Sequence, residues 1–192
     1  MIVYRKLLPQ ERDALKAHLL RLDEEDRRLR FGHFVTPEVI LAYVDAIDWS
    51  RAWIVGAFEG ELLRGVAEFS DSGASFEGSE SRRTGELSVT VEGPFQGRGI
   101  GTRLLEEALL VARNRGFQDI YLICLPENAR MQRVARKFAE QIRFQDGDVE
   151  IHITAPQPDP LSVFSELFGD AVALWETAFD RMTSWTTRKP AG

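Results

Sequence analysis

A glycine-rich segment in the middle of the chain has residue types and spacing suited to binding an anion. It reads Gln96-Gly97-Arg98-Gly99-Ile100-Gly101-Thr102 and follows a stretch of alternating polarity that ends at Val91. Glycines let a backbone turn sharply and bring its N–H groups close to a ligand, because no Cβ atoms stand in the way. A helical pattern begins at Ile100, and the first turn of a helix adds unpaired N–H groups and the positive end of the helix dipole. The segment is therefore predicted to cradle a phosphate or pyrophosphate.

Three phosphate-binding motifs compete for this segment. A Walker loop places Lys and then Ser or Thr after its last glycine, whereas Gly101 is followed by Thr102 and Arg103, which disfavours a nucleoside triphosphate. The dinucleotide fingerprint spaces its glycines as G-x-G-x-x-G, whereas Gly97, Gly99 and Gly101 alternate. The pattern that remains is Q/R-x-x-G-x-G/A, which resembles the acyl-CoA pyrophosphate loop of the GNAT superfamily of N-acetyltransferases.

The resemblance implies a fold and a cofactor. It covers residues 3–153 in element order, is specific from about residue 86 to 138, and looks most similar to the catalytic domains of bacterial protein-lysine acetyltransferases. The implied fold is mixed α/β, with a central, mostly antiparallel twisted sheet flanked by helices. The implied cosubstrate is acetyl-CoA, whose pantetheine arm would pair with the backbone of Val89 and Val91. The implied cofactor-binding residues are Val89, Val91, Gln96, Gly97, Arg98, Gly99, Ile100, Gly101, Thr102 and Asn128. Positive charge beside the phosphates is also expected from Arg103, Arg113 and Arg115.

The resemblance further implies direct transfer of the acetyl group to a primary amine, either a small molecule or a protein lysine. A lysine-like amine has a pKa of about 10.4 and arrives mostly protonated, so a base must remove a proton before attack. Glu86 occupies the position where similar enzymes carry a glutamate base, and it is the implied catalytic residue. Glu68 on the neighbouring predicted strand is the reserve candidate. A backbone N–H near Val89 would stabilise the charge that develops on the thioester oxygen.

One departure from the family pattern bears on catalysis. Similar enzymes carry a tyrosine seven positions after the asparagine, where it protonates the leaving thiolate, but Asn128 is followed at that spacing by Ala135. Either water serves as the acid or the thiolate leaves unaided, since its pKa is only modestly above neutral. The alternative function is therefore a catalytically weak regulatory module that binds CoA or acyl-CoA.

The elements that must position these residues follow from hydrophobic periodicity and turn residues. The predicted strands cover residues 2–8, 52–58, 62–69, 86–91, 120–125 and 149–153. The predicted helices cover residues 11–22, 37–44, 100–115 and 128–139. Residues 70–81 are rich in Gly and Ser and are predicted to form a loop, whose Asp71, Glu77 and Glu80 either attract a cationic amine or are simply solvated.

Composition excludes several other classes. The 192 residues include 24 Lys+Arg and 30 Asp+Glu, so the net charge of −6 disfavours non-specific binding of nucleic acid. No stretch approaches the roughly 18 uninterrupted apolar residues of a membrane span, and no signal peptide is recognised, so a cytoplasmic protein with no membrane partner is expected. Cys124 is the only cysteine, a usage that fits a reducing compartment, and it is predicted to be a small buried core residue. The three histidines are scattered, so no metal is expected.

The C-terminal region is predicted to be a separate appendage. Residues 1–154 are expected to form the acetyltransferase domain, and residues 155–192 a helical extension with a frayed tail. Within residues 161–182, apolar side chains form one stripe and the opposite face is acidic, which disfavours a membrane surface. The stripe comprises Phe164, Leu167, Phe168, Ala171, Trp175, Ala178, Phe179 and Met182. Docking on its own domain and forming a homodimer are equally favoured, and a lid over the acceptor pocket is less favoured.

Overall fold

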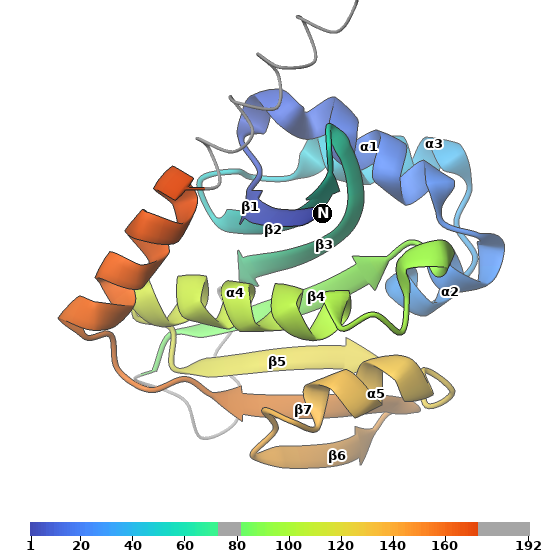
Figure 1. Ribbon diagram of the computed structural model, residues 1–192. Helices are drawn as coiled ribbons and strands as arrows, with labels where there is room; N and C mark the ends of the chain where they lie inside the picture. Colours follow the sequence, from blue (N-terminus) through green and yellow to red (C-terminus); the bar gives the residue numbers. More distant parts are fainter. Residues whose placement is uncertain (73–81, 173–192) are drawn as a thin grey trace, which may run out of the picture.

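Seven strands form one sheet in the computed structural model, which describes residues 1–72 and 82–172. The strands are β1 (Ile2–Lys6), β2 (Ala52–Glu59), β3 (Leu62–Asp71), β4 (Thr84–Val91), β5 (Asp119–Cys124), β6 (Gln141–Gln145) and β7 (Asp148–Thr154). Their order across the sheet is β1-β2-β3-β4-β5-β7-β6 (Figure 1). Neighbouring strands are antiparallel except β4 and β5, which are parallel. The mixed, mostly antiparallel sheet confirms the predicted fold class.

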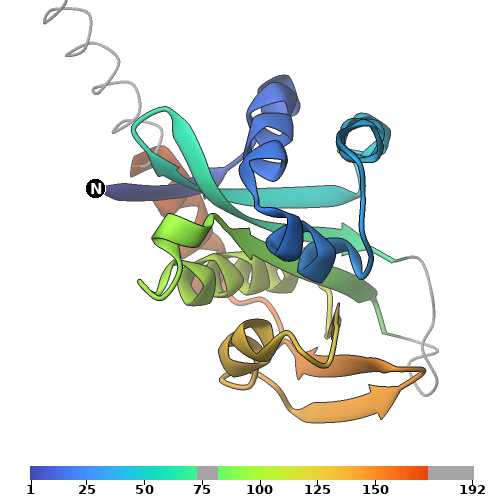
Figure 2. The same cartoon turned by 90° about the vertical axis from the view of Figure 1, so that its right-hand side faces the viewer.

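Helices cover both faces of the sheet. The helices are α1 (Arg12–Arg21), α2 (Glu24–Phe31), α3 (Pro37–Ala46), α4 (Ile100–Asn114) and α5 (Ala129–Ala135), with short 3₁₀ turns η1 (Pro9–Glu11) and η2 (Gly93–Phe95). Figure 2 shows α4 and α5 on one face and α1, α2 and α3 on the other. We call these the α4 face and the α1–α3 face.

Each face has its own hydrophobic core, because strand side chains alternate between the two faces. On the α4 face, Leu104 and Leu105 of α4 pack with Phe69, Leu87 and Ile120 of the sheet. On the α1–α3 face, a smaller core joins helical and strand residues, namely Leu15, Leu19, Ile40, Val44, Ile54, Phe58, Leu63 and Val66. The side chains of Glu68, Ser70 and Glu86 therefore lie on the α1–α3 face, because Val66 shares their strand parity and Ser70 is the cross-strand partner of Glu86.

The two parallel strands separate partway along their length. Their pairing covers only Thr84–Glu86 of β4 against Asp119–Tyr121 of β5. Beyond this point β4 continues to Val91 and β5 to Cys124, with no ladder between them. We call these diverging segments, residues 87–91 and 122–124, the β4–β5 fork. Its apex is the pair Glu86 and Tyr121, and its open end leads to the glycine-rich loop after β4 and to α5 after β5.

Two elements were not predicted from the sequence. α2 forms within the charge-dense stretch after Asp23, which caps the helix by accepting a hydrogen bond from the Asp26 N–H (2.7 Å). β6 pairs with β7 across a turn in which Asp146 and Gly147 both have positive φ, 54° and 95°. Such a turn matches the twist of a hairpin and favours Asp-Gly. The helix predicted at 128–139 is also shorter, since α5 ends at Ala135.

A further helix spans residues 160–172 and docks through its polar side. Glu166 is held by Asn114 (2.6 Å), Arg115 (2.9 Å) and Lys6, and Asp170 also bonds Lys6 (2.6 Å). The apolar stripe faces outward instead, because its members Phe164, Leu167 and Phe168 have exposed fractions between 60% and 65%. The neighbouring Leu161 and Val172 are also exposed. The stripe therefore does not mediate the docking seen here; its predicted members beyond residue 172 lie outside the described residues.

Within residues 1–72 and 82–172, no helix is both long and apolar enough to cross a membrane. The predicted division of the chain at residue 154 stays a prediction.

Candidate active site

The backbone of β4 presents to the fork groups that do not pair with β3. The Glu92 N–H donates to the Arg64 carbonyl at 2.9 Å, so Glu92 faces β3. Because backbone groups alternate sides along a strand, those of Val91 and Val89 point away from β3 and into the fork. This is the orientation that a pantetheine arm would need in order to pair with them.

The glycine-rich loop leads directly from the fork into α4. Gly97 and Gly99 have φ of 73° and 82°, a left-handed conformation that side chains rarely adopt. A Cβ at either position would meet nothing within 4 Å, so the backbone conformation is what requires glycine there. The first intrahelical bond runs from the Arg103 N–H to the Gly99 carbonyl (3.1 Å), which leaves the N–H groups of residues 100–102 unpaired within the helix. The loop and the start of α4 therefore expose backbone N–H groups, and their binding of a phosphate stays a prediction.

The side chains of Gln96 and Asn128 brace the two sides of the fork's open end. Gln96 Nε2 donates to the Val91 carbonyl (2.9 Å) and to Asp26 Oδ2 (2.8 Å), which ties the start of the loop to β4 and α2. Asn128 caps α5, because its Oδ1 accepts a hydrogen bond from the Met131 N–H at 3.0 Å. Both residues lie where a cofactor in the fork would pass, and their cofactor contacts stay predictions.

The positive charge near the loop comes partly from residues other than those expected. Arg98 is exposed in the loop, and Lys137 Nζ contacts Thr102 Oγ1 (3.3 Å) at the start of α4. Arg103 is engaged by Glu107 (2.6 Å) and Glu106. The expectation for Arg113 and Arg115 was wrong, because both lie at the far end of α4. There they hold Asp159 and Glu166 of the C-terminal region.

Glu86 sits at the apex of the fork. Its side chain is exposed on the α1–α3 face, its neighbour across β3 is Ser70, and its neighbour on β5 is Tyr121. No hydrogen bond or ion pair engages its carboxylate within residues 1–72 and 82–172. The Glu86 carboxylate is therefore accessible from the α1–α3 face.

Glu68, the reserve candidate, is engaged instead. Its Oε2 accepts hydrogen bonds from the Tyr43 hydroxyl (2.6 Å) and Arg30 Nη2 (3.1 Å). Burial alone would lower the pKa of Arg30, but Tyr43, Glu68 and Glu86 outweigh it and raise that pKa. Arg30 therefore stays charged beside both glutamates. Of the two carboxylates, Glu68 is the one held by side-chain hydrogen bonds, from Tyr43 and Arg30.

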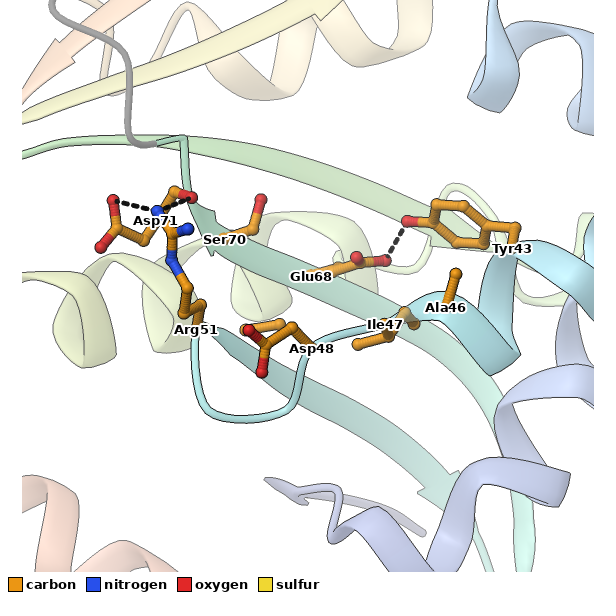
Figure 3. A pocket seen from close by; sticks show the side chains of 9 residues that line it. Tyr43, Ala46, Ile47, Asp48, Arg51, Glu68, Ser70 and Asp71 are labelled. Atoms are coloured by element: carbon orange, nitrogen blue, oxygen red, sulfur yellow. Dashed lines mark hydrogen bonds and ion pairs between the residues drawn. The ribbon is translucent and has the colours of Figure 1, made fainter.

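A pocket of about 290 Å³ adjoins Glu68 on the same face (Figure 3). It is lined by Tyr43, Ala46, Ile47, Asp48, Arg51, Ala52, Glu68, Ser70 and Asp71. Because Ser70 is the cross-strand partner of Glu86, the pocket opens beside the apex of the fork. Asp71 pairs with Arg51 (3.6 Å) at the rim. Glu77 and Glu80, the other predicted loop carboxylates, lie outside the described residues.

Two further positions bear on the chemistry. Ala135 is fully buried in the core of the α4 face. An alanine has no acidic group, so this position supplies no proton to the thiolate, as the sequence indicated. Cys124 is buried at the end of β5, and burial followed by the charge of Asp148 raises the pKa of its thiol to about 11. It is the small core residue that was predicted and is not an activated thiolate.

Sequence reasoning missed a buried network at the end of β4. Glu92 bonds His18 Nδ1 (3.2 Å), Arg21 Nε (2.8 Å) and Arg64 Nη1 (3.0 Å), while His18 Nε2 bonds Thr90 Oγ1 (2.9 Å). Burial alone would raise the pKa of Glu92, but the bonds from His18, Arg21 and Arg64 outweigh it and hold that pKa at about 2. The network fixes β4 to α1 and β3 just before the glycine-rich loop. The sequence carried no signal of it, because its members are far apart in the chain.

Glu92→Gln is expected to lower the free energy of unfolding by about 2 kcal/mol at pH 7. A carboxyl whose pKa is depressed in the folded state stabilises fully above its unfolded pKa and loses this effect as the pH falls toward 2. The difference between the wild-type protein and the variant should therefore shrink between about pH 4.5 and pH 2. Urea titrations across this range measure it. Glu59→Gln, which alters an exposed partner of the same Arg64, should show no such convergence.

The sequence was compared with models of known protein families. A family model of the acetyltransferase (GNAT) family matches residues 17–139, which include the fork, the loop and α5. The chain belongs to the GNAT family of acetyltransferases. It is therefore an acyltransferase, as the resemblance implied.

Solved structures share the fold of this GNAT acetyltransferase. The GNAT domain of PAT from S. lividans has a TM-score of 0.65 at 20% identity, over 79% of this chain and 89% of that one. A Salmonella typhimurium structure that contains its cofactor acetyl-CoA has a TM-score of 0.60 at 20% identity, over 83% and 99%. Ribosomal-protein-alanine N-acetyltransferase from Brucella melitensis has a TM-score of 0.58 at 20% identity, over 78% and 97%. In the part of this GNAT acetyltransferase that is described, no group of three or more His, Cys, Asp or Glu could hold a metal ion.

Proposed function

We propose that this GNAT acetyltransferase binds acetyl-CoA in the β4–β5 fork and transfers its acetyl group to a primary amine. The observation that carries the proposal is the end of β4–β5 pairing at Glu86 and Tyr121, directly before a left-handed glycine loop and a helix start. The pyrophosphate would lie against the N–H groups of residues 97–102. The pantetheine arm would lie along Val89 and Val91, which brings the thioester toward the apex of the fork.

At the apex of the fork, the amine and the thioester would meet from different directions, the amine from the α1–α3 face and the thioester from within the fork. The amine approaches on the α1–α3 face, where Glu86 takes up a proton from the ammonium group, directly or through water. The amine nitrogen then attacks the thioester carbon, a backbone N–H near Val89 stabilises the oxyanion, and the carbon–sulfur bond breaks. The attacking nitrogen loses its second proton as the amide forms, and the leaving thiolate takes up that proton through water, because Ala135 offers no acidic side chain. The pocket beside Ser70 would hold the rest of a small acceptor, whereas a protein lysine would need to reach past it.

The direct test is release of the CoA thiol from acetyl-CoA with a panel of small amines and lysine peptides. We expect thiol release that depends on the amine and equals the acetylated amine found by mass spectrometry. If acetyl-CoA binds but no amine is turned over, the alternative holds, and the protein is a catalytically weak acyl-CoA-binding regulatory module. That alternative is favoured by Ala135.

We also propose that the protein acts in the cytoplasm and assembles as a homodimer through the outward-facing stripe of the C-terminal helix. The polar side of this helix is committed to Lys6, Asn114 and Arg115. Phe164 and Phe168 stack on the opposite side with ring centroids 5.8 Å apart. A second copy of the chain would offer the same apolar surface to pack against it.

Phe168→Glu is expected to convert this dimer into a monomer, because a carboxylate would be buried in an apolar interface. Light scattering measures the mass of both forms. Phe144→Glu is the matched control, since Phe144 is equally exposed but lies on the edge strand β6. A monomeric wild-type protein would overturn the proposal.

A further inference from the structure

A single carboxylate on α2 connects the two sides of the fork's open end. Asp26 Oδ2 accepts a hydrogen bond from Gln96 Nε2 (2.8 Å), and Asp26 Oδ1 accepts one from Arg130 Nη2 (2.7 Å). Its side chain is only 11% exposed. Gln96 follows β4 and Arg130 follows β5, so both oxygens of this carboxylate are used to join segments that belong to different arms of the fork.

Two further contacts add to the connection that Asp26 makes between α2 and the two arms of the fork. The Gln96 amide nitrogen that bonds Asp26 also bonds the Val91 carbonyl (2.9 Å), so Asp26 helps to orient the group that fixes the first residue of the loop. A second ion pair from the same helix, Arg28 to Glu127 (2.7 Å), reaches the segment between β5 and α5.

We propose that Asp26 is a positioning residue for the acyl-CoA substrate, which fixes both the glycine-rich loop and the separation of the fork's arms. The inference rests on the proposed function, since it concerns the same binding site. An ionised carboxylate accepts both bonds strongly, and bonds to charged groups are stronger than neutral ones. Without the charge, Arg130 loses its ion pair and Gln96 loses its anchor. The loop and α5 then sample other separations, and the substrate must pay the cost of ordering them.

Asp26→Asn keeps the shape of the side chain and removes its charge. We expect the KM for acetyl-CoA to rise about tenfold, with kcat and the KM for the amine unchanged, because the acceptor side and Glu86 are not touched. A role limited to stability would lower the melting temperature without this separation of the two KM values. Glu24→Gln is the matched control, since it removes an exposed carboxylate from the same helix without altering Arg28 or Arg130.

Arg130→Gln provides a second variant at an exposed position, so the proposal stays testable if Asp26→Asn does not fold. The two single variants and the double variant form a cycle, and coupling through the ion pair predicts that their effects on acetyl-CoA affinity are not additive. Additive effects, or an unchanged affinity in Asp26→Asn, would overturn the role of Asp26. Calorimetry of acetyl-CoA with the wild-type protein separates this outcome from failure of the proposed function, which would show no binding at all.

Discussion

Gly99→Glu is expected to abolish acetyl-CoA binding, with affinity falling at least about a hundredfold. Gly99 has a φ of 82° and caps α4, so any side chain strains the backbone that presents the N–H groups of residues 100–102. A glutamate adds a carboxylate where the pyrophosphate is proposed to lie, and juxtaposed like charges cost several kcal/mol. The measurement is the rise in melting temperature on adding acetyl-CoA, which should vanish in the variant.

Gly116→Glu is the control for this variant. Gly116 also has a left-handed conformation, with a φ of 76°, and open space around its Cα, but it lies at the opposite end of α4. It should lose a similar amount of intrinsic stability and keep the full shift on adding acetyl-CoA. If Gly99→Glu also kept that shift, the loop would not be the phosphate site.

Glu86→Gln is expected to lower kcat by about a hundredfold or more, which is the usual range for losing a general base. Affinity for acetyl-CoA should hardly change, because the Glu86 side chain lies on the α1–α3 face while the proposed cofactor contacts are backbone groups within the fork. Steady-state kinetics with calorimetry of acetyl-CoA separates the two effects. The residual rate should also depend more steeply on pH, because only amine that is already deprotonated in solution can react.

Glu68→Gln tests whether Glu68, rather than Glu86, is the base. Glu68 is held by Tyr43 and Arg30, so its loss should disturb the pocket and raise the KM for the amine more than it lowers kcat. A Glu86→Gln variant with wild-type turnover across pH, together with an inactive Glu68→Gln variant, would transfer the role of base to Glu68.

The glycine loop was predictable because its information is local. Gly97, Gly99 and Gly101 fix a turn within a few residues, and the helical pattern that starts at Ile100 is continuous. The fork was not predicted from the sequence. Its position depends on where pairing between β4 and β5 stops, and that is set by packing across the whole sheet.

Other features could not be predicted because they depend on long-range partners. α2 has eight residues with no apolar periodicity, so its one readable signal was the pair of caps, Asp23 and Gly32. The stripe on the C-terminal helix was recognised, but periodicity does not tell which side of a helix docks. Here the acidic side docks because Lys6, Asn114 and Arg115 bring donors from distant elements to Glu166.

Amide hydrogen exchange with and without acetyl-CoA tests the location of the cosubstrate most directly. Exchange should slow in peptides that cover residues 87–91 and 97–102, because N–H groups in the fork and the loop gain partners on binding. Strand β1, which β2 and β3 separate from β4, should exchange as before. Protection that spares both segments at saturating acetyl-CoA, or appears only elsewhere in the chain, would contradict the proposal that acetyl-CoA binds in the β4–β5 fork.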